Sequence, residues 1–315
     1  MQYLICDIGG SSIKYAIIND ETRFLEKGNI PAPENNIGSM IEALGSLYER
    51  YRGTISAIGV SACMVIDYEK NLILEGGRYT NIRNVDLARL ISARCGGLQV
   101  AMINDSEAAL QAEMRSGVLT GCKNGVVIVI GTGIGCAFCT EGKIYRGYSY
   151  SAGEVSFLHT TPRYEEMFEN MWCEQNSAKA LVKRAKEVLE NSRAELTGID
   201  VFRYINEGNA KVLRVFDKYC MEVATQVFNI QMILDPEITA IGGAISIQPV
   251  LIETINQKLD CIYQASDSIR ELRRNYVVSC KYHNDANLYG AFYELKKALK
   301  SKNRKGAVDG YPKRA

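Results

Sequence analysis

The pattern that most constrains the fold occurs twice in the sequence. Residues 3–8 (YLICDI) and 13–18 (IKYAII) read as apolar strands on either side of a glycine turn, and residues 125–145 repeat this layout. Placing Ile8-Gly9 on Ile130-Gly131 gives an offset of 122 residues. Apolar runs bounded by glycine turns are typical of strands. The repeat predicts two copies of one domain with a cleft between them, and a chance match of two glycine hairpins is the alternative.

The rest of the chain alternates helical and strand patterns. Apolar residues recur at helical spacing, and strand-like runs such as EITAIGG and NYVVSCKY separate the helices. A length of 315 residues suggests about two domains. This alternation predicts an α/β fold with largely buried sheets. The expected helices cover residues 38–51, 85–95, 106–116, 177–191, 209–234, 246–264 and 286–300.

Charge and hydropathy exclude several classes of protein. The chain has 37 Lys and Arg against 36 Asp and Glu, so no chain-wide basic field exists to hold nucleic acid or an anionic membrane. Residues 296–315 alone carry a net charge of +7. Lys residues are favourable near a helix C-terminus, so we interpret this segment as a helix end with a solvated tail. A nucleic-acid arm is the alternative. No signal peptide and no apolar stretch of ~18 residues is present. We expect a cytoplasmic protein with neither a membrane nor a nucleic acid as partner.

The ten cysteines and two histidines do not make a metal site. Cys136 and Cys139 form a CxxC, but they lie on a predicted strand, where residues three apart point to opposite faces. No second CxxC and no nearby His completes a zinc set. Cysteines within apolar runs behave as small hydrophobic residues. We therefore expect reduced, structural cysteines.

Two glycine turns are candidates for binding phosphate. The chain lacks GxxxxGK[ST], and residues 131–135 (GTGIG) lack the GxGxxG spacing, so neither a P-loop nor a dinucleotide fingerprint is present. A glycine turn between strands can still present backbone N–H groups to a phosphate. Only the first copy carries charge, since Asp7 and Lys14 correspond to Val129 and Cys136. A tight turn without a ligand is the alternative.

Three further sites follow strand ends or flexible segments. Asn104-Asp105 lies where a strand meets helix 106–116, at the sheet edge where α/β proteins bind ligands. Asn104 and Glu107 also have the spacing of a capping box, so both could serve the helix alone. The alternative is that Asp105 acts as a general base that takes a proton from a hydroxyl group. Glu154 could hold sugar hydroxyls or be solvated, and Gly242-Gly243 could form a turn or a nucleotide contact.

Several of these segments resemble one known family. The segments DIGGSSIK (7–14), GVSACMVID (59–67), INDSEAALQAE (103–113), IGTGIG (130–135), SAGEVSF (151–157) and AIGGAIS (240–246) are similar to motifs of the ROK family of sugar kinases and repressors. The resemblance spans about residues 2–300. It implies a two-lobed hexokinase/actin-like ATPase fold made of duplicated ribonuclease-H-like domains. The expected lobes are residues 1–120 with 287–302, and residues 121–286, followed by a disordered basic tail at 303–315.

The resemblance also implies a role for each candidate residue. Asp7 would position Mg²⁺ through water, and Asp105 would be the general base. The phosphates would lie near Gly9, Gly10, Ser11, Ser12 and Lys14, with Thr132 and Gly133 as a second phosphate turn. The adenosine would lie near Gly242 and Gly243. The sugar would contact Asn81, Asn104, Asp105 and Glu154.

Departures from the family pattern shape the expected activity. The family's zinc motif should lie at about 160–180, but that region holds Cys173 alone, and Phe157 replaces the histidine that ends GE[IV]GH. We expect no zinc. The resemblance implies ATP-dependent phosphorylation of the 6-hydroxyl of glucose or a β-glucoside, by an enzyme that is usually a homodimer. The alternatives are an N-acetylmannosamine or other hexose kinase, or a non-catalytic sugar-binding protein. A repressor is not expected, because the first strand begins by residue 3 and leaves no room for a helix-turn-helix.

Overall fold

A computed structural model describes residues 1–160, 166–189 and 196–308, with the side chains of 303–308 left out. The chain divides into two compact units. Unit 1 comprises Met1–Ala112, Arg146–Ser151 and Asp285–Ala315, and unit 2 comprises Glu113–Tyr145 and Ala152–Asn284. None of the described helices is both long enough and apolar enough to cross a bilayer. The lobe boundaries that the resemblance implies, residues 1–120 with 287–302 and residues 121–286, stay a prediction.

Unit 1 is built on a five-stranded sheet in the order β3-β2-β1-β4-β7. Antiparallel pairing joins β1 to β2 and β2 to β3, whereas β1 and β4, and then β4 and β7, run parallel. A separate hairpin, β5–β6, leaves the sheet after β4. The strands are β1 (Gln2–Ile8), β2 (Ser12–Asn19), β3 (Phe24–Pro31), β4 (Ile55–Ala62), β5 (Val65–Asp67), β6 (Leu72–Glu75) and β7 (Gln99–Asn104).

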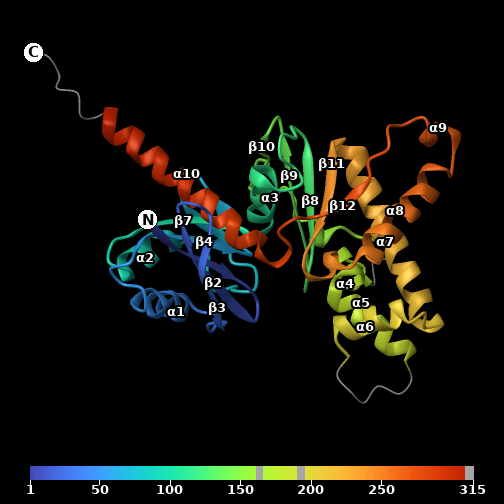
Figure 1. Ribbon diagram of the computed structural model, residues 1–315, viewed down its shortest axis with the longest axis horizontal. Helices are drawn as coiled ribbons and strands as arrows, with labels where there is room; N and C mark the ends of the chain where they lie inside the picture. The colour runs from blue at the N-terminus through green and yellow to red at the C-terminus, as the bar shows by residue number, and fades with distance from the viewer. Residues whose placement is uncertain (161–165, 190–195, 309–315) are drawn as a thin grey trace, which may run out of the picture. The chain divides into compact units, whose positions relative to one another are not determined.

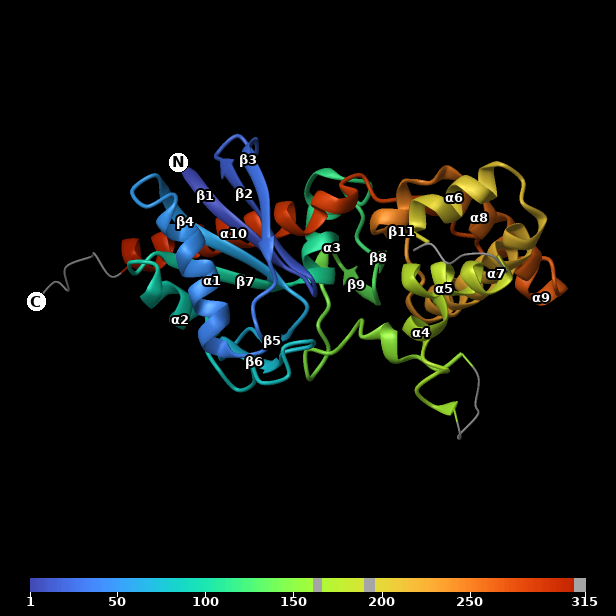
Figure 2. The ribbon, with the colours of Figure 1, turned by 90° about the horizontal axis from the view of Figure 1, so that it is seen from below.

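Helices cover both faces of this sheet (Figures 1 and 2). One core contains Leu4 and Cys6 of β1 with residues of α1 and α2, and the other contains Tyr3 and Ile5 with residues of α3 and α10. Side chains alternate across a strand, so β1 supplies both cores and is buried on both faces. The helices are α1 (Ile37–Glu49), α2 (Leu87–Arg94), α3 (Asp105–Ser116) and α10 (Ala286–Val308).

Unit 2 repeats the sheet of unit 1. Its order is β10-β9-β8-β11-β12, with β8 antiparallel to β9, β9 antiparallel to β10, and β11 parallel to both β8 and β12. Thus β8 corresponds to β1 and β9 to β2, as the offset of 122 residues predicts. This confirms the duplication expected from the sequence. The strands are β8 (Gly125–Ile130), β9 (Ile134–Thr140), β10 (Lys143–Ile144), β11 (Ile238–Gly242) and β12 (Val277–Ser279).

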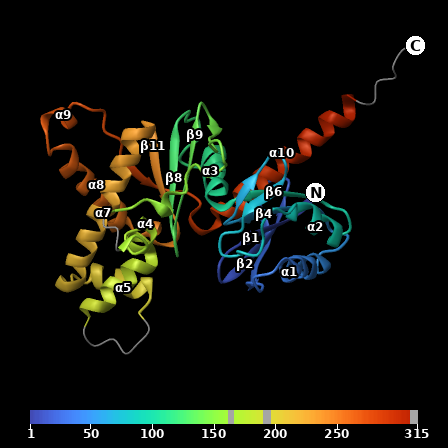
Figure 3. The same ribbon diagram turned by 180° about the vertical axis from the view of Figure 1, so that it is seen from behind.

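The helices of unit 2 lie on one side of β8 and β11 (Figure 3). Their core includes Cys136 but not Cys139, which confirms that the two thiols of the CxxC lie on opposite faces of β9. None of the ten cysteines forms a disulfide. The helices are α4 (Trp172–Asn176), α5 (Ala178–Val188), α6 (Gly198–Asn206), α7 (Ala210–Leu234), α8 (Pro249–Tyr263) and α9 (Asp267–Arg270), with 3₁₀ turns η1 (Val155–Phe157), η3 (Ala244–Ile247) and η4 (His283–Asp285).

Helix ends largely follow the sequence signals. Helix α5 begins after Ser177, whose hydroxyl accepts from the Ala180 N–H, and α7 ends at Asp235 just before Pro236. The last helix differs from expectation. It continues to Val308, past the end near residue 300 and into the tail expected from 303. The remainder of that tail, 309–315, lies outside the described residues.

Candidate active site

The first glycine turn joins β1 to β2 in unit 1. Asp7 and Lys14 are cross-strand partners directly before and after it, so the hairpin register brings their backbones together. The Gly9 N–H donates to the Ser12 carbonyl at 3.0 Å, which closes the turn around Gly10 and Ser11. Ser11 and Lys14 are exposed. The structure therefore brings Asp7, Gly9, Gly10, Ser11, Ser12 and Lys14 together at one sheet edge.

Asp7 is a buried carboxylate that accepts a hydrogen bond from a neutral amide. It is 6% exposed, and the Asn287 amide Nδ2 at the start of α10 donates to Oδ1 at 3.1 Å. Burial raises the pKa of Asp7, while the Asn287 hydrogen bond and the charge of Lys14 oppose the shift. Carboxylate oxygens suit Mg²⁺, and a desolvated carboxylate gains from a nearby cation. The residues therefore fit the expected magnesium ion, which Asp7 would hold through water.

Asp105 begins α3, at the carboxyl end of β7. Its Oδ1 accepts from the Ser106 N–H at 2.8 Å and from the Ser106 hydroxyl at 3.3 Å. Burial and the charge of Asp7 raise the pKa of Asp105 to about 6, and hydrogen bonds from Ser106 and from the Cys63 thiol oppose the shift. A carboxylate with a pKa near the working pH is suited to general base catalysis. This effect of Asp7 also shows that the two carboxylates lie near each other in unit 1.

Asn104 caps α3, as its capping-box spacing predicts. Its Oδ1 accepts from the backbone N–H groups of Ser106 and Glu107, at 2.9 and 3.1 Å. The capping box is only half formed, since the Asn104 N–H donates to the Tyr68 hydroxyl at 3.1 Å and not to Glu107. The amide Nδ2 donates to the Met64 carbonyl at 3.2 Å. One amide hydrogen of Nδ2 is left over for a ligand.

Glu107 belongs to a buried network that holds this junction. It accepts from the Tyr68 hydroxyl at 2.8 Å and pairs with Arg146 at 2.8 Å. The Arg146 guanidinium also lies 3.8 Å from the centroid of the Tyr68 ring. Arg146 opens the segment that leads toward Glu154, so the network ties that segment to α3. Sequence reasoning missed Tyr68, Arg146 and Asn287, because each meets its partner across at least 36 residues.

Asn81 lies in the loop that follows β6, in unit 1. Its Nδ2 donates to the Asn35 carbonyl at 2.9 Å, and its N–H donates to the Asn35 side chain at 3.3 Å. The side chain is exposed. Both of these hydrogen bonds join Asn81 to Asn35, and its role in binding sugar stays a prediction.

The second glycine turn, in unit 2, joins β8 to β9. The Gly131 N–H donates to the Gly133 carbonyl at 2.9 Å, and Thr132 at its tip is exposed. Gly243 lies in the same unit, one residue beyond β11, with φ +89°. A Cβ on Gly243 would lie 2.2 Å from the Ile130 carbonyl oxygen, so only glycine fits there. The close approach brings Gly242-Gly243 beside the end of β8.

Glu154 follows a second obligatory glycine of unit 2. Gly153 has φ +98°, and a Cβ there would lie 2.3 Å from the Cys136 carbonyl oxygen. Burial raises the pKa of the Cys136 thiol, and the charge of Glu154 adds to the shift, so Glu154 lies near β9. Its side chain is exposed, as is that of Phe157 in the turn that follows.

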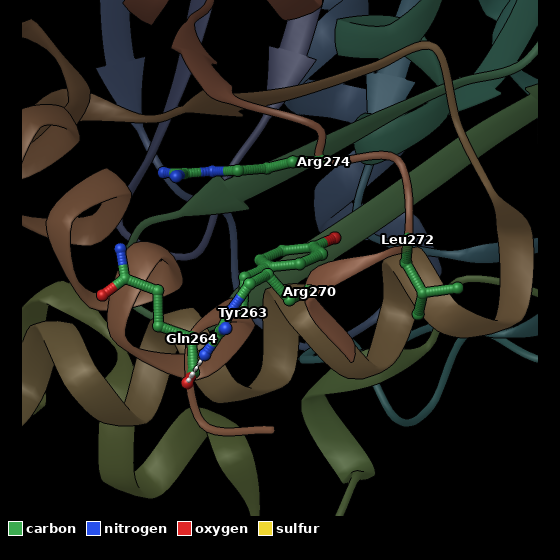
Figure 4. A pocket seen from close by; sticks show the side chains of 5 residues that line it. All are labelled: Tyr263, Gln264, Arg270, Leu272 and Arg274. Atoms are coloured by element: carbon green, nitrogen blue, oxygen red, sulfur yellow. Dashed lines mark hydrogen bonds between the residues drawn. The ribbon is translucent and has the colours of Figure 1, made fainter. Parts of the chain in front are cut away.

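The region of the family's zinc motif includes Cys173 in α4, and residues 161–165 lie outside the described residues. Within the described parts of the chain, no group of three or more His, Cys, Asp and Glu side chains is arranged to hold a metal. A pocket of about 500 Å³ lies elsewhere in unit 2, lined by Tyr263, Gln264, Arg270, Leu272 and Arg274 (Figure 4). It contains none of the predicted site residues.

Comparison with known proteins identifies the family that the sequence matches. A sequence profile described as the ROK family matches residues 3–298. The chain is 25% identical over 307 residues to the β-glucoside kinase of Listeria monocytogenes, covering 96% of this chain and 99% of the relative. It is 22% identical over 298 residues to the N-acetylmannosamine kinase of Citrobacter koseri, covering 92% and 97%.

Solved structures show the same fold. A ROK family protein from Streptococcus pneumoniae in complex with sucrose superposes with a TM-score of 0.82 at 25% identity, covering 96% of this chain and 100% of that one. A ROK family glucokinase from Streptomyces griseus in complex with glucose and AMPPNP gives 0.80 at 21% identity, covering 92% and 98%. The α/β fold expected from the sequence, the duplicated fold of the ROK kinases, is thereby confirmed.

Proposed function

The chain belongs to the ROK family, and from this premise we propose that it is an ATP-dependent sugar kinase. The preferred acceptor is the 6-hydroxyl of glucose or of a β-glucoside. The proposal rests on the position and pKa of Asp105. This carboxylate lies at the carboxyl end of β7, and its pKa is raised to about 6. We further propose that it acts as a cytoplasmic homodimer.

Asp105 would act as the general base. It accepts the proton of the sugar hydroxyl while the new O–P bond forms and the bond between the γ-phosphorus and the β-phosphate oxygen breaks. Phosphoryl transfer relies mainly on positioning and charge neutralisation, so the base needs to be held in place. The Ser106 donors and the α3 junction supply that support.

The remaining residues keep the roles that the resemblance implies. In unit 1 the β1–β2 turn and Lys14 would bind phosphate, and Asp7 would hold the magnesium ion, which neutralises phosphate charge when bound. In unit 2 the turn at Thr132-Gly133 would bind phosphate, Gly242-Gly243 would contact the adenosine, and Glu154 would bind sugar hydroxyls. Asn81 and Asn104 would contact the sugar from unit 1.

The β-glucoside is favoured by two observations. The β-glucoside kinase of Listeria monocytogenes matches almost the whole chain. In addition, Phe157 stands where the family has a histidine and is 59% exposed, so an aromatic surface is open to an aglycone. N-acetylmannosamine is the second candidate, because a kinase for that sugar is also among the relatives.

Purified protein is assayed for ADP release with glucose, N-acetylmannosamine, cellobiose and arbutin. We expect turnover with glucose or a β-glucoside in the presence of Mg²⁺ and ATP. The Asp105→Asn variant should bind ATP with unchanged affinity and lose at least about 100-fold in kcat, since the lost proton transfer contributes on that order. Substantial residual activity of this variant would refute the base assignment. A wild type that binds sugar without releasing ADP would show a non-catalytic sugar-binding protein.

A further inference from the structure

The loop between β6 and α2 packs closely against Cys63, the residue that follows β4. A Cβ on Gly76 would lie 2.2 Å from the Tyr79 carbonyl oxygen, and one on Gly77, at φ +57°, would lie 2.3 Å from the Cys63 carbonyl oxygen. The Tyr79 N–H also donates to the Gly76 carbonyl at 2.9 Å. Two glycines in close contact fix the path of the residues that follow them.

This packing brings Arg78 to the first glycine turn. The neighbouring Tyr79 is buried, and its hydroxyl donates to the Gly9 carbonyl at 3.2 Å. Arg78 Nη1 lies 3.1 Å from the position that a Cβ on Gly10 would take, and its Cδ lies 3.5 Å away. The guanidinium group therefore lies against the first glycine turn. Lys14 follows this turn as the third residue of β2.

The side chain of Arg78 is exposed, and within the described ranges it forms no ion pair with an acidic side chain. Arg83, five residues further along the same loop, pairs with Glu75 at 2.8 Å. The first glycine turn lies between Asp7 on β1 and the exposed Lys14 on β2, and the charge of Asp7 acts on Asp105 in the same unit. A phosphoryl group that approaches two carboxylates gains from positive charge in addition to that of Lys14 and of the proposed magnesium ion.

We propose that Arg78 is a catalytic residue that binds the phosphoryl group being transferred. The inference rests on the proposed kinase function. A guanidinium group donates up to five hydrogen bonds in a fixed fork, which matches two oxygens of one phosphoryl group. Charge spreads over these oxygens in the transition state, so a donor fixed beforehand against the turn lowers the barrier. The role predicts a preference for ligands that carry a γ-phosphoryl group.

Calorimetric titration with Mg·AMPPNP and Mg·ADP tests binding without turnover. Arg78→Ala should weaken AMPPNP by about ten-fold or more, as expected for a lost charge-assisted hydrogen bond, and change ADP less than about two-fold. Arg78→Lys should fall between the wild type and Arg78→Ala, because it keeps the charge without the fork. The matched control is Arg83→Ala, in the same loop and paired with Glu75. It should behave as the wild type with both nucleotides.

Steady-state kinetics complete the test. Arg78→Ala should lower kcat by about 100-fold and leave the KM for the sugar unchanged. Equal weakening of ADP and AMPPNP, unchanged AMPPNP affinity, or a raised sugar KM with normal kcat would each overturn the role. A wild type that binds AMPPNP through Arg78 but phosphorylates no sugar would refute the kinase proposal and the catalytic role, and would keep only the binding of the γ-phosphoryl group by Arg78. A wild type that binds no AMPPNP would refute both.

Discussion

For single residues, the proposed chemistry depends on two carboxylates of unit 1, the buried Asp7 and the half-buried Asp105. The sequence motifs identified Asp7 and Asp105, and the structure adds that the charge of Asp7 helps to raise the pKa of Asp105. The folded protein binds the proton of Asp105 more tightly than the unfolded chain does, whereas catalysis needs the ionised form. Part of the folding stability is therefore given up to keep a charged base in the site.

This cost gives the Asp105→Asn variant a pH-dependent stability. Below about pH 4 the carboxyl is protonated in both folded and unfolded chains, so the substitution should change little. As the pH rises from about 4 to 6, the unfolded chain ionises first and the wild type loses stability. Above pH 7, Asp105→Asn should be more stable by about 1 to 3 kcal/mol, since one pKa unit corresponds to about 1.4 kcal/mol. Thermal unfolding at pH 4 and pH 7.5 measures the difference.

Asp20 provides a control, because its pKa is shifted in the opposite direction to that of Asp105. Hydrogen bonds from Lys296 and the N-terminus lower its pKa, so its ionised form stabilises the folded chain above the unfolded pKa. Asp20→Asn should lower the Tm at pH 7.5 and have little effect at low pH. An unchanged or lower Tm for Asp105→Asn at pH 7.5 would contradict the raised pKa on which the base assignment rests.

At the scale of elements, the sequence signals located most helices and strands but not the contacts between them. The capping spacing of Asn104 and Glu107 correctly marked the start of α3, and Asn104 caps it. The same spacing was wrong about the Glu107 side chain, which binds Arg146 across 39 residues. A local pattern cannot show such a partner, because tertiary packing decides between a capping bond and a buried ion pair.

Gly243 tests the turn that follows β11. Gly243→Ala forces a Cβ into the Ile130 carbonyl at a positive φ, so it should destabilise unit 2 by about 2 kcal/mol or more and weaken AMPPNP binding. Gly142→Ala is the matched control, since Gly142 has φ +72° and no atom within 4 Å of the added Cβ. It should cost about 1 kcal/mol and leave nucleotide binding intact. Thermal unfolding and titration check both, and equal effects would show that the close contact is irrelevant.

At the scale of the whole molecule, the duplication was the most predictable feature. Two apolar glycine hairpins at a fixed offset predicted two sheets, and both sheets have the same strand order. The place of Arg146–Ser151 in unit 1 was less predictable, because no sequence pattern marks that segment. The candidate residues were found through motifs, whereas Arg78, Asn287 and the Tyr68 network required the structure.

The central claim is that this chain transfers phosphate to a primary sugar hydroxyl. Phosphorus NMR of the product formed from Mg·ATP and a responsive sugar tests it directly. We predict an ATP-dependent phosphate ester whose phosphorus couples to two protons, as attachment to the C6 methylene requires. Asp105→Asn should form none of it in the same time. A phosphorus signal coupled to one ring proton, or no ester with any sugar that binds, would contradict the account.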